Sequence, residues 1–414
     1  MDYDMIRLKM EYDVWKELWD FFEAEIIEKI IKESEVENYE NQLKLIHEGY
    51  SFKITKNLTP KLYILVEEIK SKLEFKEEID FYITNSPDTN AYAVSKTNEK
   101  DKNFIVVNSS LIKDYDEDEL KFIIGHEIGH LISGYARLYK IIEFIFPEGK
   151  EIPLIFKNKI LLWANLSELT ADRYGFIASE NFNKCISTFF KLSSGLDIKN
   201  FDFNYETYLK DIEKTINKFN SKSILTGDVH PINPIRIKSI ELFSKSELFK
   251  QIKNKIKLKN DKNLEKDTDK LIENLLHISF SDLDKFRKDF IVSAGIIVAT
   301  LDKDFDDNEV EYIIRILSQF TMFPRKYFDS ILKRTDIFKI FTRSLIKIIK
   351  KNPIERYDMF EFLVDIALID RKIKEVEINF LFDVGKKLFN LQRTEIAQII
   401  GKRINRIFLP TIIK

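Results

Sequence analysis

The sequence predicts an α+β protein that is mostly helical, with an all-α domain in its C-terminal third. Apolar residues recur at helical spacing through most of the chain. Strand-like runs occur in three short segments, at residues 79–84, 91–95 and 104–107. The C-terminal third contains a repeated pattern of helix, short turn and helix. Together these observations predict a mixed domain followed by a helical one.

Length and charge set the outer limits. With 414 residues, the chain is long enough for two or three domains. Its 66 basic and 68 acidic residues nearly balance, so the overall charge gives no reason to expect a nucleic-acid partner. The single cysteine, Cys185, excludes an intramolecular disulfide and fits a reducing compartment. We therefore expect a cytoplasmic protein without nucleic acid.

The sequence predicts no transmembrane segment. The N-terminus lacks the continuous apolar run of a secretory signal. Residues 141–163 are apolar in pieces, but Pro147, Pro153 and the charges between them interrupt the run before the ~20 residues that a membrane span requires. We expect a packed insertion here, with an apolar hairpin that touches a membrane or lines the cleft as the alternative.

The chain is predicted to begin with an N-terminal helical extension, residues 1–57. Residues 4–33 have the pattern of one long amphipathic helix. Its apolar stripe consists of Trp15, Trp19, Phe22, Ile26 and Ile30. A further helix begins at Thr59-Pro60, because proline is favoured in the first helical turn.

The stretch 122–130 contains HEIGH, an example of the HExxH motif. On a helix, His126 and His130 project from one face, one turn apart, as two ligands of a tetrahedral metal must. Glu127 lies on the adjoining face, where its carboxylate can take a proton from a metal-bound water. The motif therefore predicts a zinc site with Glu127 as general base.

A third ligand is expected in a helix between about residues 159 and 179. Glu168, near its middle, would complete a set of two histidines and one carboxylate, which leaves room for water as catalytic zinc sites do. Asp172 lies one turn further on the same face, where it can accept the free ring N–H of a ligand histidine. Small residues would let the two helices approach closely; they are Gly125, Gly129, Ala171, Gly175 and Ala178.

HEIGH followed by ELTAD at residues 168–172 resembles the gluzincin family of zinc metallopeptidases that includes HtpX and the CAAX prenyl proteases. Three further segments resemble that family. They are Asn90-Ala91-Tyr92-Ala93, like its N-A-x-A segment; the strand at 104–107 with the turn after it; and His230-Pro231 with Arg236, like its late HP…R motif. The resemblance covers about residues 58–242.

This resemblance implies a minigluzincin-like core, in the order helix, small β-sheet, zinc helix and glutamate helix. It implies that His126, His130 and Glu168 bind Zn²⁺ and that Asp172 orients a ligand histidine. Glu127 would be the base, in agreement with the reading of the motif itself.

Two of the matching motifs have more than one interpretation. Residues 90–93 are either an ordinary strand entry or an edge strand that pairs with the backbone of a substrate. His230 is a helix-capping residue, a donor that steadies the oxyanion, or a fourth zinc ligand that displaces the water. Arg236 would anchor a carboxylate, either of the site or of the substrate.

The C-terminal third contains an internal repeat, in which residues 299–310 align with residues 367–378. Phe305 and Ile373 occupy equivalent places in the two turns. This repeat resembles TerB-like helical domains. We place a metallopeptidase domain at 58–245, a charged linker or helix at 246–270 and the TerB-like domain at 271–414.

The sequence thus predicts a zinc-dependent metalloendopeptidase that cleaves protein or peptide substrates by Glu127-assisted attack of zinc-bound water. The helical C-terminal domain is expected to recruit or restrain the enzyme, and a regulatory protein would bind there. The competing hypothesis is a binding or scaffold protein of a stress or defence system, which keeps a zinc-stabilised fold without turnover.

Overall fold

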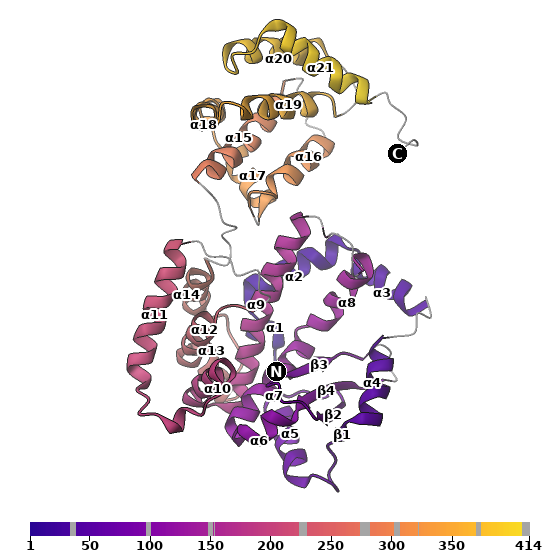
Figure 1. The fold of residues 1–414 in the computed structure, drawn as a ribbon, viewed down its shortest axis with the longest axis vertical. Coiled ribbons are helices and arrows are strands. Elements are labelled where there is room, and N and C mark those ends of the chain that lie inside the picture. The colour runs from indigo at the N-terminus through magenta and orange to yellow at the C-terminus, as the bar shows by residue number, and fades with distance from the viewer. Residues whose placement is uncertain are drawn as a thin grey trace. The chain divides into compact units, whose positions relative to one another are not determined.

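The computed structural model describes residues 1–33, 39–96, 101–147, 152, 154–222, 230–273, 282–301, 307–321, 323–369 and 374–407. The chain divides into two compact units (Figure 1), one formed by residues 1–152 and 159–276 and the other by residues 153–158 and 277–414. Helices dominate both units, and a single small sheet lies in the described part of the first. The expected class, mostly helical α+β, is confirmed.

The sheet of the first unit is four-stranded and mixed, in the order β1-β2-β4-β3. Its strands are β1 (Phe52–Lys53), β2 (Ile79–Thr84), β3 (Ala91–Val94) and β4 (Asn103–Asn108). β2 and β4 run parallel, whereas β1 and β3 are antiparallel to their neighbours. β4 is buried along its whole length, as a central apolar strand should be, while β3 lies at an edge.

The N-terminal segment forms short helices, α1 (Tyr3–Ile6), α2 (Lys9–Phe21), α3 (Ala24–Glu33) and α4 (Tyr39–Tyr50). The single helix expected over residues 4–33 is therefore wrong. Glu23 adopts a left-handed φ of 49° and ends the first long run. The predicted apolar stripe is divided as a result, and Ile26 and Ile30 are about half exposed instead of packed.

Buried polar contacts join this segment to α9 (Leu154–Ser179). Glu11 is completely buried and forms a bidentate ion pair with Arg7, at 2.8 and 2.9 Å. Glu11 also accepts a hydrogen bond from the Trp163 indole N–H on α9 at 3.2 Å. Arg173 donates to the Ile6 carbonyl at 2.9 Å. The N-terminal helices are thus part of the same packed unit as the predicted glutamate helix.

The remaining helices of this unit are α5 (Pro60–Lys72), α6 (Ser109–Asp114), α7 (Glu117–Ile132), α8 (Tyr135–Ile145), α10 (Phe182–Ser194), α11 (Tyr205–Lys222), α12 (Asn233–Lys245), α13 (Glu247–Lys253) and α14 (Lys262–Ile272). The other helices lie on both sides of α7 and α9, with α11 to α14 grouped away from the sheet (Figure 1). Asp116 starts α7 with a capping box, in which its side chain accepts from the Glu119 N–H and the Glu119 side chain accepts from the Asp116 N–H. Residues 246–270 are largely helical, in α13 and α14.

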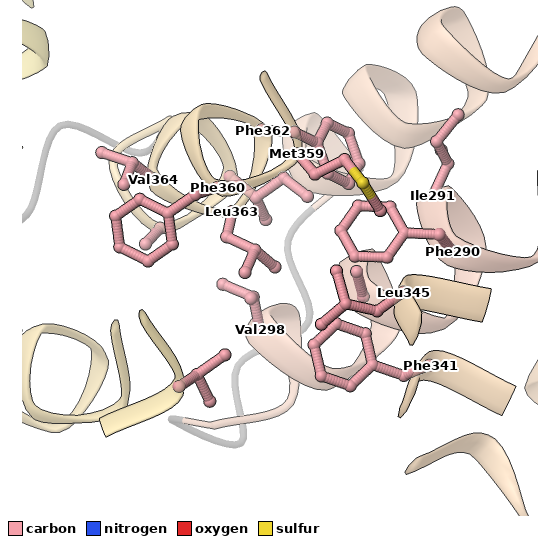
Figure 2. Packing of buried hydrophobic residues seen from close by; sticks show 14 of the residues in the cluster. Phe290, Ile291, Val298, Phe341, Leu345, Met359, Phe360, Phe362, Leu363 and Val364 are labelled. Carbon is pink, nitrogen blue, oxygen red and sulfur yellow. The ribbon is translucent and has the colours of Figure 1, made fainter. Parts of the chain in front are cut away.

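The second unit is helical throughout its described residues. Its helices are α15 (Asp282–Ala299), α16 (Asp307–Leu317), α17 (Pro324–Leu332), α18 (Ile337–Lys351), α19 (Glu355–Ala367), α20 (Glu375–Lys387) and α21 (Arg393–Ile407). Buried side chains from all seven helices form its core. Those labelled in Figure 2 come from α15, α18 and α19, where Phe290 stacks on Phe341 at 5.6 Å between ring centroids. The repeat's two turns, with Phe305 and Ile373, lie outside the described residues.

Among the helices described in either unit, none combines the length and the apolar character needed to span a bilayer.

Candidate metal centre

Helices α7 and α9 lie unusually close together, because glycines stand where they meet. A Cβ added to Gly125 would lie 2.6 Å from Ala178 Cβ, and one added to Gly175 would lie 2.6 Å from the Phe122 carbonyl oxygen. Both distances are far below van der Waals contact, so a larger residue does not fit at either position. This close approach brings side chains of α7 and α9 to one point.

At that point, His126, His130 and Glu168 converge. The two Nε2 atoms of the histidines are 3.1 Å apart. The Glu168 carboxylate lies 3.3 Å from His130 Nε2 through Oε1 and 3.5 Å from His126 Nε2 through Oε2. Ligands of one tetrahedral zinc, with bonds of 2.0–2.1 Å, are separated by about 3.3 Å. The observed separations are close to this value, although the two carboxylate distances involve different oxygens. One ligand atom from each side chain lies within 4.8 Å of the others, so the three residues are near enough to share one ion.

The chemistry of these groups also fits a divalent cation. All three residues are buried, and the Glu168 Oε2 atom accepts no hydrogen bond of good geometry among the described residues, although Arg236 lies near it. A buried carboxylate oxygen that lacks a well-aligned donor leaves capacity for a further positive group. Two imidazole nitrogens and one carboxylate are a donor set that zinc accepts, with a position left open. His126, His130 and Glu168 could hold such an ion.

Asp172 and Arg236 support the converging side chains. Asp172 is completely buried, and its Oδ1 lies 2.9 Å from His126 Nδ1. In the tautomer that donates this hydrogen bond, Nε2 is the ring nitrogen available to a metal. Arg236 of α12 donates to Asp172 through Nε at 2.8 Å and through Nη2 at 2.7 Å. Its Nη2 also lies 3.2 Å from Glu168 Oε2. Arg236 therefore anchors two carboxylates of the site itself.

The electrostatics of the site keep both of these carboxylates charged. Burial alone would raise the pKa of Glu168, but Arg236 and the two histidines outweigh it and hold that pKa well below its usual range. For Asp172, too, Arg236 outweighs burial and lowers the pKa. Burial alone would lower the pKa of His130, whereas the nearby Glu168 carboxylate reverses this and raises it.

Glu127 differs from the other carboxylates. It is buried, and this burial raises its pKa above the ordinary value despite the two adjacent histidines. A glutamate with a raised pKa holds a proton more readily than an exposed one. This property suits a group that accepts and then returns a proton near neutral pH.

His230 lies at the open side of the site. Its side chain is 56% exposed, and its Nε2 is 3.7 Å from Glu168 Oε2. Residues 223–229, which precede it, are outside the described part of the chain. The structure thus places His230 beside the converging groups, at the end that faces solvent.

Along residues 90–93, the backbone N–H and C=O groups point alternately towards β4 and away from it. The Asn108 N–H donates to the Asn90 carbonyl at 3.0 Å, and the antiparallel register places Tyr92 opposite Val106. Hydrogen-bonded and non-hydrogen-bonded pairs alternate in such a ladder, so the N–H and C=O groups of Ala91 and Ala93 point away from β4. No other described strand pairs with that edge. The Tyr92 hydroxyl contacts His47 Nε2 at 2.6 Å, so its side chain is engaged within the fold.

Tyr135 also belongs to this region, although sequence reasoning missed it. Its ring centroid is 4.8 Å from that of His130, and its ring stacks on Trp163 at 4.9 Å. Gly134, with a left-handed φ of 71°, ends the α7 segment and turns α8 back over the histidine. The signal available in the sequence was Gly134, because a glycine four residues after His130 indicates that the chain turns back there.

Replacing Gly175 with alanine should weaken both folding and zinc binding. Alanine in an open helix is up to about 1 kcal/mol more stable than glycine, but a methyl group 2.6 Å from a backbone oxygen forces the helices apart at a cost of about 1–3 kcal/mol. Urea unfolding and zinc titration would measure the two effects. The control is Gly49→Ala in α4, where no atom lies within 4 Å of the added methyl. Equal behaviour of the two variants would contradict the close-approach argument.

A mostly helical α+β unit in which two histidines one turn apart meet a distant glutamate is typical of metallopeptidases. The comparisons agree. The model of Peptidase family M48 matches residues 57–145, which include His126, Glu127 and His130. This chain carries a domain of peptidase family M48, and the resemblance to HtpX-like peptidases is confirmed at that level.

Two curated relatives cover different lengths. "Plastoglobule-localized metallopeptidase 48, chloroplastic" from Arabidopsis thaliana is 26% identical over 219 residues, 49% of this chain and 62% of that protein. "Protease HtpX homolog" from Helicobacter acinonychis (strain Sheeba) is 37% identical over 103 residues, 25% of this chain and 28% of that protein. The chain thus spans less than two thirds of either relative. No solved structure matches it significantly.

Proposed function

We propose that this protein is a zinc-dependent metalloendopeptidase of the HExxH…ExxxAD type, with His126, His130 and Glu168 as the zinc ligands. The observation that carries the proposal is the convergence of these three side chains, whose ligand atoms lie within 4.8 Å of one another. The M48 family match supports a metallopeptidase. The gluzincin subdivision and the TerB-like nature of residues 271–414 stay predictions, as does the cytoplasmic location.

The proposed mechanism assigns one task to each side chain. Zinc, when bound, would polarise a peptide carbonyl and lower the pKa of water. Glu127 accepts the proton of the attacking water and passes it to the leaving amine, so the peptide bond breaks without net change in the enzyme. Asp172 fixes the tautomer of His126, and Arg236 holds Asp172 in place. His230, at the open side, donates to the oxyanion as it forms.

We further propose that the substrate is an extended peptide that adds to the free edge of β3. Ala91 and Ala93 offer their N–H and C=O groups to its backbone, while Asn90 and Tyr92 pair with β4 and hold the strand in register. Backbone pairing of this kind recognises extended protein chains irrespective of most side chains. It therefore favours unstructured protein segments as substrates.

Metal analysis combined with a peptide digest tests the proposal. The purified chain should contain about one zinc ion per molecule and should cleave an unstructured protein such as casein, with loss of cleavage on chelation and recovery with zinc. A zinc-replete chain that cleaves nothing, and remains inert as His230→Ala, would support the alternative of a binding or scaffold protein.

Residues 271–414 are proposed to recruit or restrain the peptidase through a regulatory protein, while residues 58–245 carry catalysis. Ending the chain after Leu276, where the first compact unit ends, tests this assignment. The cut keeps α14, whose buried Leu271 and Ile272 belong to that unit. A rise in cleavage of casein indicates restraint, whereas unchanged cleavage of casein with loss of a native partner indicates recruitment. A truncated chain that folds but differs in neither property would contradict both roles.

A further inference from the structure

A pocket of about 460 Å³ lies between β3 and α8, beside the candidate metal centre. Helices α3 and α4, the end of α7 and strand β3 contribute to its walls together with α8. Figure 1 shows β3 at the edge of the sheet towards α8, with α3 next to α8. The apolar side chains that line it include Ile31, Leu43, Val94, Leu131, Tyr135 and Tyr139.

The pocket borders the proposed peptide-binding edge and shares one residue with the surroundings of the metal centre. Ala93, whose backbone groups point to the free edge of β3, is one of its lining residues. Tyr135 is another, and its ring lies 4.8 Å from that of the zinc-ligand candidate His130. A peptide that pairs with β3 would therefore pass beside this pocket. The part of the peptide next to the pocket would be close to the bond that is cleaved.

Acidic and basic side chains nearly balance around the pocket. Glu28 accepts two hydrogen bonds from Arg137, at 2.9 and 2.8 Å. Glu77 pairs with Lys96 at 3.0 Å. The other charged lining residues are Lys32, Lys140 and Glu143. Because opposite charges nearly balance, a charged substrate side chain gains little there, whereas a large apolar one gains buried area against the apolar walls.

Helix α3 closes the outer side of the pocket, and it lies outside the segment that matches family M48. The Arg137 guanidinium joins α3 to α8, because it pairs with Glu28 of α3 and also lies 4.9 Å over the ring of Trp19. Ile31 on α3 faces the pocket, whereas its neighbour Ile30 is 46% exposed and does not line it.

We propose that this pocket binds a large apolar side chain of the substrate, and that the N-terminal helix α3 sets its size. The proposal rests on the peptidase function proposed above and adds the substrate class: extended peptides with an aromatic or branched aliphatic residue near the scissile bond.

The test measures binding and cleavage separately. Binding is measured by titrating the zinc-loaded full-length Glu127→Gln protein with fluorescent peptides. Each peptide carries Phe, Leu, Ala, Asp or Lys at one position, and that position is moved along the peptide from one set to the next. Cleavage of the same peptides is measured with the wild type. We expect Phe and Leu peptides to bind at least about tenfold more tightly than the Ala and Asp peptides at one position. Ile31→Trp, which fills the pocket, should remove that preference. Tyr139→Ala, which enlarges it, should extend the preference to Trp.

Ile30→Trp is the matched control, since it adds the same ring one residue away on the exposed face. It should leave the preference unchanged. Equal binding of all the peptides, or an equal effect of Ile31→Trp and Ile30→Trp on the preference, would contradict the proposed role of the pocket even if the wild type cleaves peptides. Selective binding without any cleavage would support the pocket and count against the peptidase function.

Discussion

Glu127→Gln is expected to retain zinc and to lose cleavage activity, with kcat reduced about 10²–10⁴-fold. The structure places Glu127 outside the converging set, so its amide counterpart removes no metal ligand. Glutamine fills nearly the same buried volume but cannot accept the proton of the attacking water. The change therefore separates proton transfer from metal binding. Zinc content and cleavage of an unstructured protein are the two measurements.

Two further variants make this comparison decisive. Glu168→Gln should lower zinc affinity and reduce the zinc-dependent gain in thermal stability, because the carboxylate of the third ligand is gone. Glu117→Gln is the control on α7, the helix of Glu127. Glu117 is exposed and pairs with Lys121, so its replacement should change neither zinc content nor cleavage. Retained cleavage by Glu127→Gln would remove Glu127 from the mechanism while leaving the metal site untouched.

Arg236→Ala should reduce the free energy of unfolding of the zinc-free protein by about 3–5 kcal/mol. The side chain is almost completely buried and contacts Asp172 and Glu168, which are buried as well. Without it, the two buried carboxylates are left close together with only the imidazoles of His126 and His130 as partners. Urea unfolding in the presence of a chelator would measure the loss.

Zinc should restore part of the stability that Arg236→Ala loses, because the ion compensates the Glu168 charge. Lys238→Ala is the control on the same helix. Lys238 pairs with Glu213 and Glu241 near the surface, and its removal should cost no more than about 1 kcal/mol. If Arg236→Ala proves as stable as Lys238→Ala without zinc, the buried ion cluster does not have the energetic role assigned here.

The local parts of this structure were predictable from the sequence. Histidines four residues apart on an apolar run specify their own geometry, and the small residues of α9 indicated the close approach of α7. The break at Glu23 was not predictable, because the apolar period continues through a residue whose backbone becomes left-handed. Periodicity reports which side of a helix is apolar and does not report where the helix ends.

The features that the sequence did not predict depend on long-range contacts. Arg236 meets Asp172 across 64 residues, and the sequence alone could not decide whether it anchors the site or the substrate. Glu11 gave no signal, because an isolated acidic residue on a helix is usually solvated, whereas here Arg7 and Trp163 satisfy it in the interior. Such pairings depend on the tertiary fold, which brings distant charges together before either can be buried.

The contacts of Glu11 and Arg173 also bear on how the protein is synthesised. The first helices leave the ribosome long before α9, which their residues contact in the folded protein. Helix α12, which supplies Arg236 to Asp172, is made later still. A nascent chain that ends before Arg236 lacks the cation that holds Asp172 against His126. The newborn polypeptide therefore cannot complete this centre until more than half of its 414 residues have been made.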